Sequence, residues 1–170
     1  MSRLIRYANL EDSDVLGKIH SESLQVAVKD IIPDYVLKDD FCIERRTKRF
    51  IRELSEASPK TAIVFDGDEP AGLISFGKGR YGNNDNSWIE IWRVYLTPKF
   101  WGNGVAKELV EWGISEILKK NFSNIELWVL EENIRAIKFY KKNGFKHDNT
   151  VQIINIGREL KELRYIKVYE

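Results

Sequence analysis

The stretch Val94-Tyr95-Leu96-Thr97-Pro98-Lys99-Phe100-Trp101-Gly102-Asn103-Gly104-Val105-Ala106 joins the clearest strand of the chain to a helix. The strand is predicted over residues 88–96, where β-branched and aromatic residues dominate, and Thr97-Pro98 ends it. From Val105 to Leu118 apolar residues recur at helical spacing. The first amides of such a helix have no intrahelical partner and lie at the positive end of its dipole. The junction therefore predicts an anion-binding site.

Two glycines strengthen this prediction. Gly102 and Gly104 allow the backbone to close on a ligand without intervening Cβ atoms, and a pyrophosphate would fit there. The bare Gly-x-Gly pattern is equally compatible with a tight turn that needs glycine for its backbone angles. The stretch is not a Walker loop, because the Gly-Lys-Ser/Thr ending is missing. It is not a dinucleotide-binding fingerprint either, because Lys107 stands where the third glycine belongs.

The composition indicates one compact domain spanning residues 1–170. A chain of 170 residues that is 43% hydrophobic and 31% charged encloses one core and is too short to divide comfortably into two. Its 27 basic and 26 acidic residues nearly cancel. No overall electric field therefore favours binding to nucleic acid or to an anionic membrane, and a small or locally charged substrate is expected.

The sequence also predicts a cytoplasmic location. Cys42 is the single cysteine, so an internal disulfide cannot form. Met1 leads into Ser-Arg-Leu-Ile-Arg, without the apolar core and cleavage site of a signal peptide. No uncharged apolar run approaches the roughly 20 residues that span a bilayer.

The remaining elements follow from periodicity and turn signals. Strands are expected at residues 4–7, 61–65, 71–76, 125–130, 151–156 and 163–168, and helices at 15–28, 41–54 and 134–140. The expected buried stripe of the 41–54 helix consists of Ile43, Phe50, Ile51 and Leu54. Asn9 and Asn133 are predicted N-caps, and Asn143-Gly144 is a predicted left-handed stop. The order β-α-α-β-β-β-α-β-α-β-β is mixed α/β around one layered sheet.

Two blocks of the sequence resemble the GNAT superfamily of acetyl-CoA-dependent N-acetyltransferases. Residues 94–106 resemble its motif A, whose core Gln/Arg-x-x-Gly-x-Gly/Ala reads Lys99-Phe100-Trp101-Gly102-Asn103-Gly104 here. Asn133–Phe145 resembles motif B, Asn-x-x-Ala-x-x-Phe-Tyr-x-x-x-Gly-Phe. Lys99 keeps the positive charge of the usual Gln/Arg position but lacks the planar fork of arginine. The resemblance covers nearly the whole chain and implies the GNAT fold.

The resemblance implies direct transfer of an acetyl group from acetyl-CoA to a primary amine in a ternary complex, without a metal. The pantetheine arm is expected to lie where the strand ending at Leu96 splays from the strand starting at Ile125, and to pair with the backbone of Val94 and Leu96. A backbone N–H near Leu96 is the expected oxyanion donor. The implied cofactor-binding residues are Val94, Leu96, Lys99, Trp101, Gly102, Asn103, Gly104, Val105 and Asn133.

Two side chains are candidates for catalysis. Tyr140 aligns with the motif B tyrosine that often protonates the leaving CoA thiolate, although it could instead be an aromatic packed on a helix face. Glu90 lies where some family members place a catalytic carboxylate, although it could instead pair with Arg93 or a neighbouring strand. Even spacing puts Glu90 on the face of Val94 and Leu96 if no bulge intervenes, and a bulge is common in this strand of the family.

The acceptor is expected to be a small-molecule amine or an amine of a protein, selected by residues 21–56 and 77–86. Five acidic residues could attract a cationic amine such as a polyamine, although basic residues lie among them: Asp30, Asp34, Asp39, Asp40 and Glu44. Four tryptophans could line an acceptor pocket or belong to the core: Trp88, Trp92, Trp101 and Trp128. A non-catalytic acyl-CoA sensor, a transferase of longer acyl groups, a protein-binding subunit and a homodimer stay open.

Overall fold

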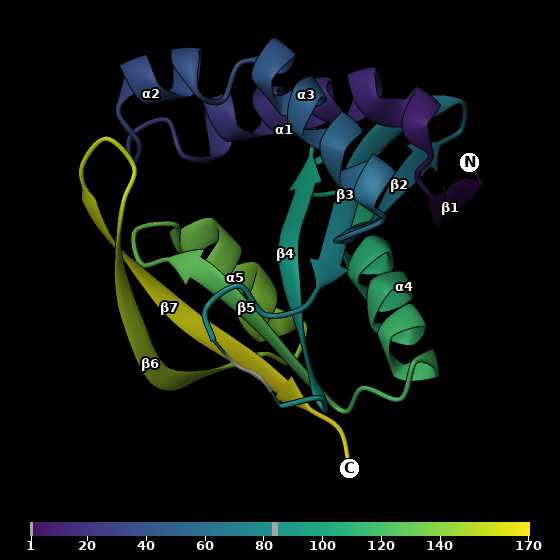
Figure 1. Ribbon diagram of the computed structural model, residues 1–170, viewed down its shortest axis with the longest axis vertical. Helices are drawn as coiled ribbons and strands as arrows, with labels where there is room; N and C mark the ends of the chain where they lie inside the picture. Colours follow the sequence, from purple (N-terminus) through teal and green to yellow (C-terminus); the bar gives the residue numbers. More distant parts are fainter. Residues whose placement is uncertain (1, 83–84) are drawn as a thin grey trace.

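The computed structural model describes residues 2–82 and 85–170, and Figure 1 shows a twisted sheet with helices on both of its sides. In the described residues one seven-stranded sheet has the order β1-β2-β3-β4-β5-β7-β6. Its strands are β1 (Arg3–Tyr7), β2 (Lys60–Asp66), β3 (Glu69–Gly77), β4 (Trp88–Leu96), β5 (Asn124–Leu130), β6 (Lys146–Asn155) and β7 (Glu159–Val168). The helices are α1 (Ser13–Ala27), α2 (Asp34–Asp39), α3 (Ile43–Glu56), α4 (Val105–Lys119) and α5 (Ile134–Lys142), with 3-10 turns η1 (Leu10–Asp12) and η2 (Pro98–Phe100).

The predicted fold class and element order are confirmed, with the short helix α2 in addition. Pro33 accounts for α2, because it ends the preceding helical pattern and its fixed φ of −56° suits the residue before a new first turn. Strands β6 and β7 also begin earlier than predicted. They form a hairpin in which backbone pairing continues beyond the alternating apolar residues, from Asn155–Glu159 to Lys146–Ile166.

The predicted caps are confirmed. Asn9 forms a capping box with Asp12, although it caps the 3-10 turn η1 that leads into α1. Asn133 caps α5, where its side chain accepts a hydrogen bond from Ala136 N at 3.2 Å. Gly144 follows α5 with a φ of +86°, a conformation that favours glycine.

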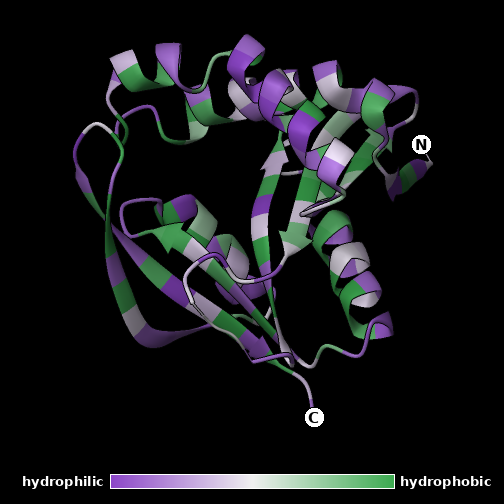
Figure 2. Ribbon diagram, viewed as in Figure 1, coloured by the Kyte–Doolittle hydropathy of each residue, from purple (hydrophilic) through white to green (hydrophobic). Residues whose placement is uncertain are grey.

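The helices cover the two faces of the sheet. Side chains of β2 and β3 alternate: Ala62 and Ile74 belong to the apolar cluster that contains α4, while Ile63 and Leu73 pack with α1 and α3. Figure 2 shows these strands as largely hydrophobic and much of α3 as hydrophilic. This alternation fixes which side chains of a strand face which helix layer.

Helix α3 buries a different stripe from the predicted one. Phe50 is fully buried, but Ile43 and Ile51 are 46% and 44% exposed. Instead, Glu53 is buried, with 4% exposed. Its carboxylate binds Arg93 of β4, so a charge interaction that apolar periodicity does not register helps to set the rotation of the helix.

Strand β4 lies in the middle of the sheet and separates from β5. It pairs antiparallel with β3 as far as Leu96, but parallel with β5 through only three residues, Trp88, Ile89 and Glu90. The register with β3 shifts, since Ser75 pairs with Arg93 and Phe76 with Ile91. Trp92 is therefore the extra residue of a β-bulge.

The bulge changes which residues of β4 share a face. Ile89 and Ile91 pack in the same cluster as Val94 and Leu96. Glu90 therefore lies on the opposite face, and the prediction from even spacing that Glu90 shares a face with Leu96 is wrong.

None of the helices in the described part of the chain is long and apolar enough to cross a membrane.

The close packing of α1 on α3 gives a stability test. A Cβ atom at Gly17 would lie 2.7 Å from Thr47 N and 2.9 Å from Thr47 Cα. We predict that Gly17→Ala destabilises the protein by about 1–3 kcal/mol, despite the higher helix propensity of alanine, because the two helix backbones must separate. Denaturant unfolding measures the change. The exposed neighbour Lys18→Ala is the control and should change stability by less than about 0.5 kcal/mol; equal stabilities of the two variants would contradict this account.

Candidate active site

The loop between β4 and α4 presents backbone donors without partners. Gly102 and Gly104 have φ values of +80° and +86°, and Gly104 is the N-cap of α4 without a side-chain cap. Among the described residues, no carbonyl or side chain accepts from the amides of Gly102, Asn103 or Gly104. In the first turn of the 15-residue helix α4, Val105 N has only a long contact of 3.4 Å with Asn103 Oδ1. Together with this helix N-terminus, the loop donors suit an anion such as a pyrophosphate.

Side chains around this loop are tied to their neighbours. Lys99 binds Glu69 at 2.6 and 2.8 Å, so its ammonium is held at the β2–β3 turn instead of standing free for a phosphate. The Trp101 Nε1 donates to the Leu96 carbonyl at 3.0 Å, and the Arg135 guanidinium lies 3.8 Å from its ring centroid. Trp101 thus connects the end of β4 to the start of α5.

The free edge of β4 adjoins this loop. Beyond Glu90, β4 has no ladder pairing with β5, so the backbone of Val94 and Leu96 has no strand partner on that side. Helix α5 starts at Ile134 with Asn133 as its N-cap, shortly after β5 ends at Leu130, and its second residue, Arg135, contacts Trp101. The structure thus brings together four of the predicted cofactor-binding positions: Val94, Leu96, Trp101 and Asn133.

Tyr140 lies on α5 in an aromatic setting, with ring centroids 5.4 Å from Phe139 and 5.9 Å from Phe145. Its side chain is partly exposed. Burial, and to a smaller extent Tyr95, raises the pKa of the phenol well above its ordinary value. Tyr140 therefore stays protonated across neutral pH, as a proton donor must.

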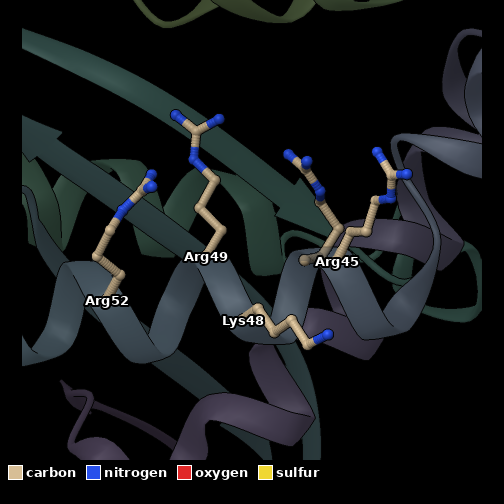
Figure 3. Close-up of a pocket in the computed structure, with 5 residues that line it drawn as sticks. Arg45, Lys48, Arg49 and Arg52 are labelled. Atoms are coloured by element: carbon tan, nitrogen blue, oxygen red, sulfur yellow. The ribbon is translucent and has the colours of Figure 1, made fainter.

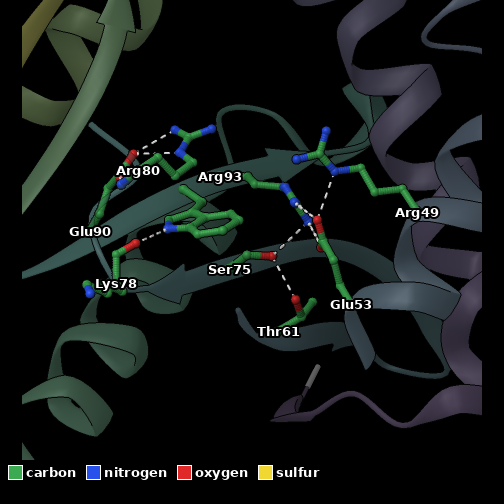
Figure 4. Close-up of polar contacts among 9 residues, drawn as sticks. Arg49, Glu53, Thr61, Ser75, Lys78, Arg80, Glu90 and Arg93 are labelled. Atoms are coloured by element: carbon green, nitrogen blue, oxygen red, sulfur yellow. Dashed lines mark hydrogen bonds and ion pairs between the residues drawn. The ribbon is translucent and has the colours of Figure 1, made fainter. Parts of the chain in front are cut away.

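Glu90 is completely buried and bound to Arg80, not to Arg93 (Figure 4). Its carboxylate accepts from the backbone N of Arg80 at 2.7 Å and from Nε and Nη2 at 2.9 and 2.6 Å. Burial lowers the pKa of the Arg80 guanidinium, but the hydrogen bonds to Glu90 raise it, so that the pKa lies above its ordinary value. A carboxylate so fully bonded has little freedom to take a proton directly from a substrate.

Glu162 of β7 is a second carboxylate in this region that the sequence analysis missed. It accepts a hydrogen bond from Gln152 Nε2 at 2.7 Å. Burial raises its pKa, Gln152 and then Arg80 lower it, and Glu90 raises it, with burial prevailing. A raised pKa makes the Glu162 carboxylate a stronger base than an ordinary glutamate. The alternation of β7 alone does not distinguish Glu162 from a surface glutamate.

A second ion-pair network lies on the same face of β4. Arg93 binds Glu53 through both carboxylate oxygens at 2.7 and 2.8 Å, and Arg49 donates to Glu53 at 2.8 Å (Figure 4). Next along β4, the Tyr95 ring lies 4.7 Å from that of His20. Burial and the charges of Arg93, Arg46 and Arg49 lower the pKa of His20 well below its usual value, so His20 is neutral.

The four tryptophans are all partly exposed, so none is a fully buried core residue. Trp88 and Trp128 line a recess of 520 Å³ together with Tyr81 and Gln152. Trp92 donates to the Lys78 carbonyl at 3.0 Å. Of the loop 77–86, predicted to select the acceptor, residues 83 and 84 lie outside the described part of the chain.

The sequence matches the family model described as Acetyltransferase (GNAT) family over residues 26–145. The chain belongs to the GNAT family. As a member, it is an acyltransferase, and the fold that the resemblance implied is the one found.

Named relatives of this GNAT protein cover most of its length. It is 28% identical to the Bacillus subtilis protein called Uncharacterized N-acetyltransferase YuaI, over 81% of this chain and 76% of that protein. It is 25% identical to the spermidine N(1)-acetyltransferase of Thermoplasma acidophilum, over 88% of this chain and 92% of that protein.

Solved structures share the fold at lower identity. The PaiA N-acetyltransferase of Thermoplasma acidophilum, in complex with coenzyme A, superposes with a TM-score of 0.79 at 22% identity, covering 99% of this chain and 100% of that chain. The putative acetyltransferase YncA of Salmonella typhimurium, with acetyl-CoA, gives a TM-score of 0.74 at 17% identity, covering 100% of this chain and 95% of that chain.

The raised pKa of Glu162 predicts a pH-dependent stability. A carboxyl whose pKa is higher in the folded state stabilises the fold when protonated, and this contribution is lost as pH rises through its folded pKa. We expect the free energy of unfolding of Glu162→Gln, measured with denaturant, to increase relative to that of the wild type as the pH is raised from 4 to 7.5. The control Glu159→Gln, an exposed position at the start of β7, should show no such gain. A constant difference between wild type and Glu162→Gln would contradict the assignment.

Proposed function

We propose that the chain transfers the acetyl group of acetyl-CoA to a primary amine by direct attack. The observation that carries the proposal is the loop of unpartnered amides, Gly102 to Gly104, directly beside the unpaired edge of β4. Relatives named for acetylating spermidine and thialysine support an amine acceptor. Acetyl-CoA would supply an activated thioester at the opening between β4 and β5.

The roles of the cofactor-binding residues follow from their positions. Gly102, Asn103, Gly104 and the N-terminal amides from Val105 onward would hold the pyrophosphate through backbone N–H groups. The backbone of Val94 and Leu96 would pair with the pantetheine arm as an added strand does, at Leu96 through its N–H because the carbonyl already accepts from Trp101 Nε1.

We assign side-chain contacts with the cofactor to two further residues. The carboxamide nitrogen of Asn133 remains for the arm, because only its oxygen is used for capping. Lys99 would reach a phosphate only by leaving Glu69, so we assign it the smaller role.

Proton transfer needs two groups. A lysine-like amine has a pKa of about 10.4 and is almost wholly protonated at neutral pH, so a base must deprotonate it before attack. We assign this role to Glu162, with Glu90 holding Arg80 beside it and acting only through water. A backbone N–H near Leu96 would stabilise the oxyanion. Tyr140, held as a neutral phenol, would protonate the departing thiolate.

We also propose a cytoplasmic location, which the free Cys42 supports because an unpaired thiol suits a reducing compartment. A homodimer stays a prediction.

Tyr140→Phe tests the proposal, because it removes the proton donor and leaves the ring contacts in place. We predict that kcat for thiol release from acetyl-CoA, with a panel of primary amines, falls by about 100-fold to 10,000-fold, while the affinity for acetyl-CoA is unchanged. Tyr7→Phe is the control: its hydroxyl binds Glu116 and its ring packs on Trp112 of α4. Unchanged turnover in Tyr140→Phe would remove Tyr140 from catalysis. Absence of turnover in the wild type, despite binding of acetyl-CoA, would favour an acyl-CoA sensor.

A further inference from the structure

Helix α3 presents a row of cations along one recess. Five side chains line this recess of 460 Å³: Arg45, Arg46, Lys48, Arg49 and Arg52. Figure 3 shows Arg49 and Arg52 extending to the same side of the helix, while Lys48 points away from them. Residues three, four and seven positions apart on a helix share a face, so the row is a consequence of spacing.

The carboxylates near this row do not balance it. Asp39 and Asp40 both bind Arg45, and Glu44 binds Lys48. Glu53 is shared between Arg49 and Arg93, so one negative charge serves two guanidinium groups.

Two arginines of the row are left over. Among the described residues, neither Arg46 nor Arg52 has a carboxylate partner. Arg46 Nε is buried without a hydrogen-bond acceptor, and its guanidinium lies 4.8 Å from the Phe41 ring centroid. Burial, followed by the charges of Arg49 and Arg93, lowers the pKa of Arg46, and the smaller opposing effects of Asp40 and Cys42 do not offset this.

The row is connected to the candidate active site by direct contacts. Arg49 reaches Glu53, which binds Arg93 of β4. By a second route Arg46 covers Phe41, whose ring meets His20, and His20 in turn packs on Tyr95. Tyr95 is only one residue from Leu96, where the β4 edge is free.

A carboxyl of β7 also acts on Tyr95. After burial, which chiefly raises the pKa of the Tyr95 phenol, four charged groups act on it: Arg93, Arg80, Glu162 and Arg46. Glu90 is bound to Arg80. The polarity around Tyr95 therefore rests on the guanidinium groups of α3 and on Glu162, whose carboxylate accepts from Gln152. A molecule with both an amine and an anionic group matches this polarity.

We propose that the acceptor is an amine that also carries an oxyanion, a carboxylate or a phosphate, and that Arg46, Arg49 and Arg52 bind this oxyanion. The inference rests on the proposed acetyl transfer and specifies its substrate class. Arginine is suited to the role because its fork binds oxyanions in a bidentate manner. Three of the five acidic residues that could attract a polyamine, Asp39, Asp40 and Glu44, are already paired with cations of the same segment.

The test compares amines that differ only in the oxyanion. Lysine is compared with 1,5-diaminopentane, other amino acids with their decarboxylated amines, and phosphoethanolamine with ethylamine. Thiol release gives kcat/KM, and calorimetry on the CoA complex gives affinity for each member of a pair. We expect at least one oxyanion-bearing amine to exceed its counterpart about tenfold or more. The carboxylate and phosphate pairs show which oxyanion is preferred.

Variants of α3 then test whether the row causes the preference for oxyanion-bearing amines. Arg52→Gln, at an exposed and unpaired position, should reduce this preference, and the double variant Arg46→Gln/Arg52→Gln should abolish it. The affinity for acetyl-CoA should be unchanged in both variants. Lys119→Gln, an exposed cation in the last turn of α4 paired with Glu116, is the control and should retain the preference for oxyanion-bearing amines.

Each contrary result has its own meaning. If acetyl-CoA does not bind, the proposed function fails and this inference with it. If acetyl-CoA binds but no oxyanion-bearing amine is acetylated or bound better than its counterpart, the inference is overturned while the transferase stands. A preference that survives the double variant would also overturn it.

Discussion

Separation of β4 from β5 after three residue pairs is the constraint on which the rest of the site depends. Each strand keeps a full partner on its other side: β4 pairs with β3 up to Leu96, and β5 pairs with β7 along its whole length. Each half of the sheet therefore keeps its own backbone pairing beyond Glu90. The price of the opening is a row of unpaired backbone groups, which water or a ligand must satisfy.

The neighbours of the opening prevent its closure. Helix α5 follows β5 directly, and Trp101 binds the Leu96 carbonyl while stacking with Arg135 of that helix. Val94, Leu96, Tyr140 and Phe145 join the same apolar cluster as α4. A ligand that pairs with β4 thus enters a preformed edge beside a preformed anion-binding loop, and little ordering remains to be done on binding.

The bulge at Trp92 decides which face of the sheet carries the charged residues of β4. It places Glu90 and Arg93 on the face of α1 and α3, where Arg93 forms a buried ion pair with Glu53 and the buried Glu90 pairs with the partly exposed Arg80. Buried ion pairs are often no more stabilising than apolar residues of similar volume, so stability alone does not explain two of them on one strand. Their concentration next to the free edge is typical of functional sites, where charge is arranged at the expense of stability.

Local chemistry made the conformations of Gly102 and Gly104 and the caps predictable. The Gly102 and Gly104 angles and the capping by Asn133 depend on residues within a few positions, and the motif B resemblance made Tyr140 a candidate. The face of Glu90 was not predictable, because it depends on a register shift against β3. Glu162, Arg46 and Arg52 were missed for a similar reason: their positions relative to Tyr95 depend on how β7 and α3, which are far apart in the chain, are arranged around β4.

The most direct test of the central claim is isothermal calorimetry of acetyl-CoA binding to the wild type and to Gly104→Val. Valine strongly disfavours the φ of +86° at this position, so the loop amides would be displaced. We predict micromolar binding by the wild type and its loss in the variant, with both proteins folded by circular dichroism. Absence of binding in a folded wild type, or equal binding by the variant, would contradict the assignment of this loop and strand edge as the acetyl-CoA site.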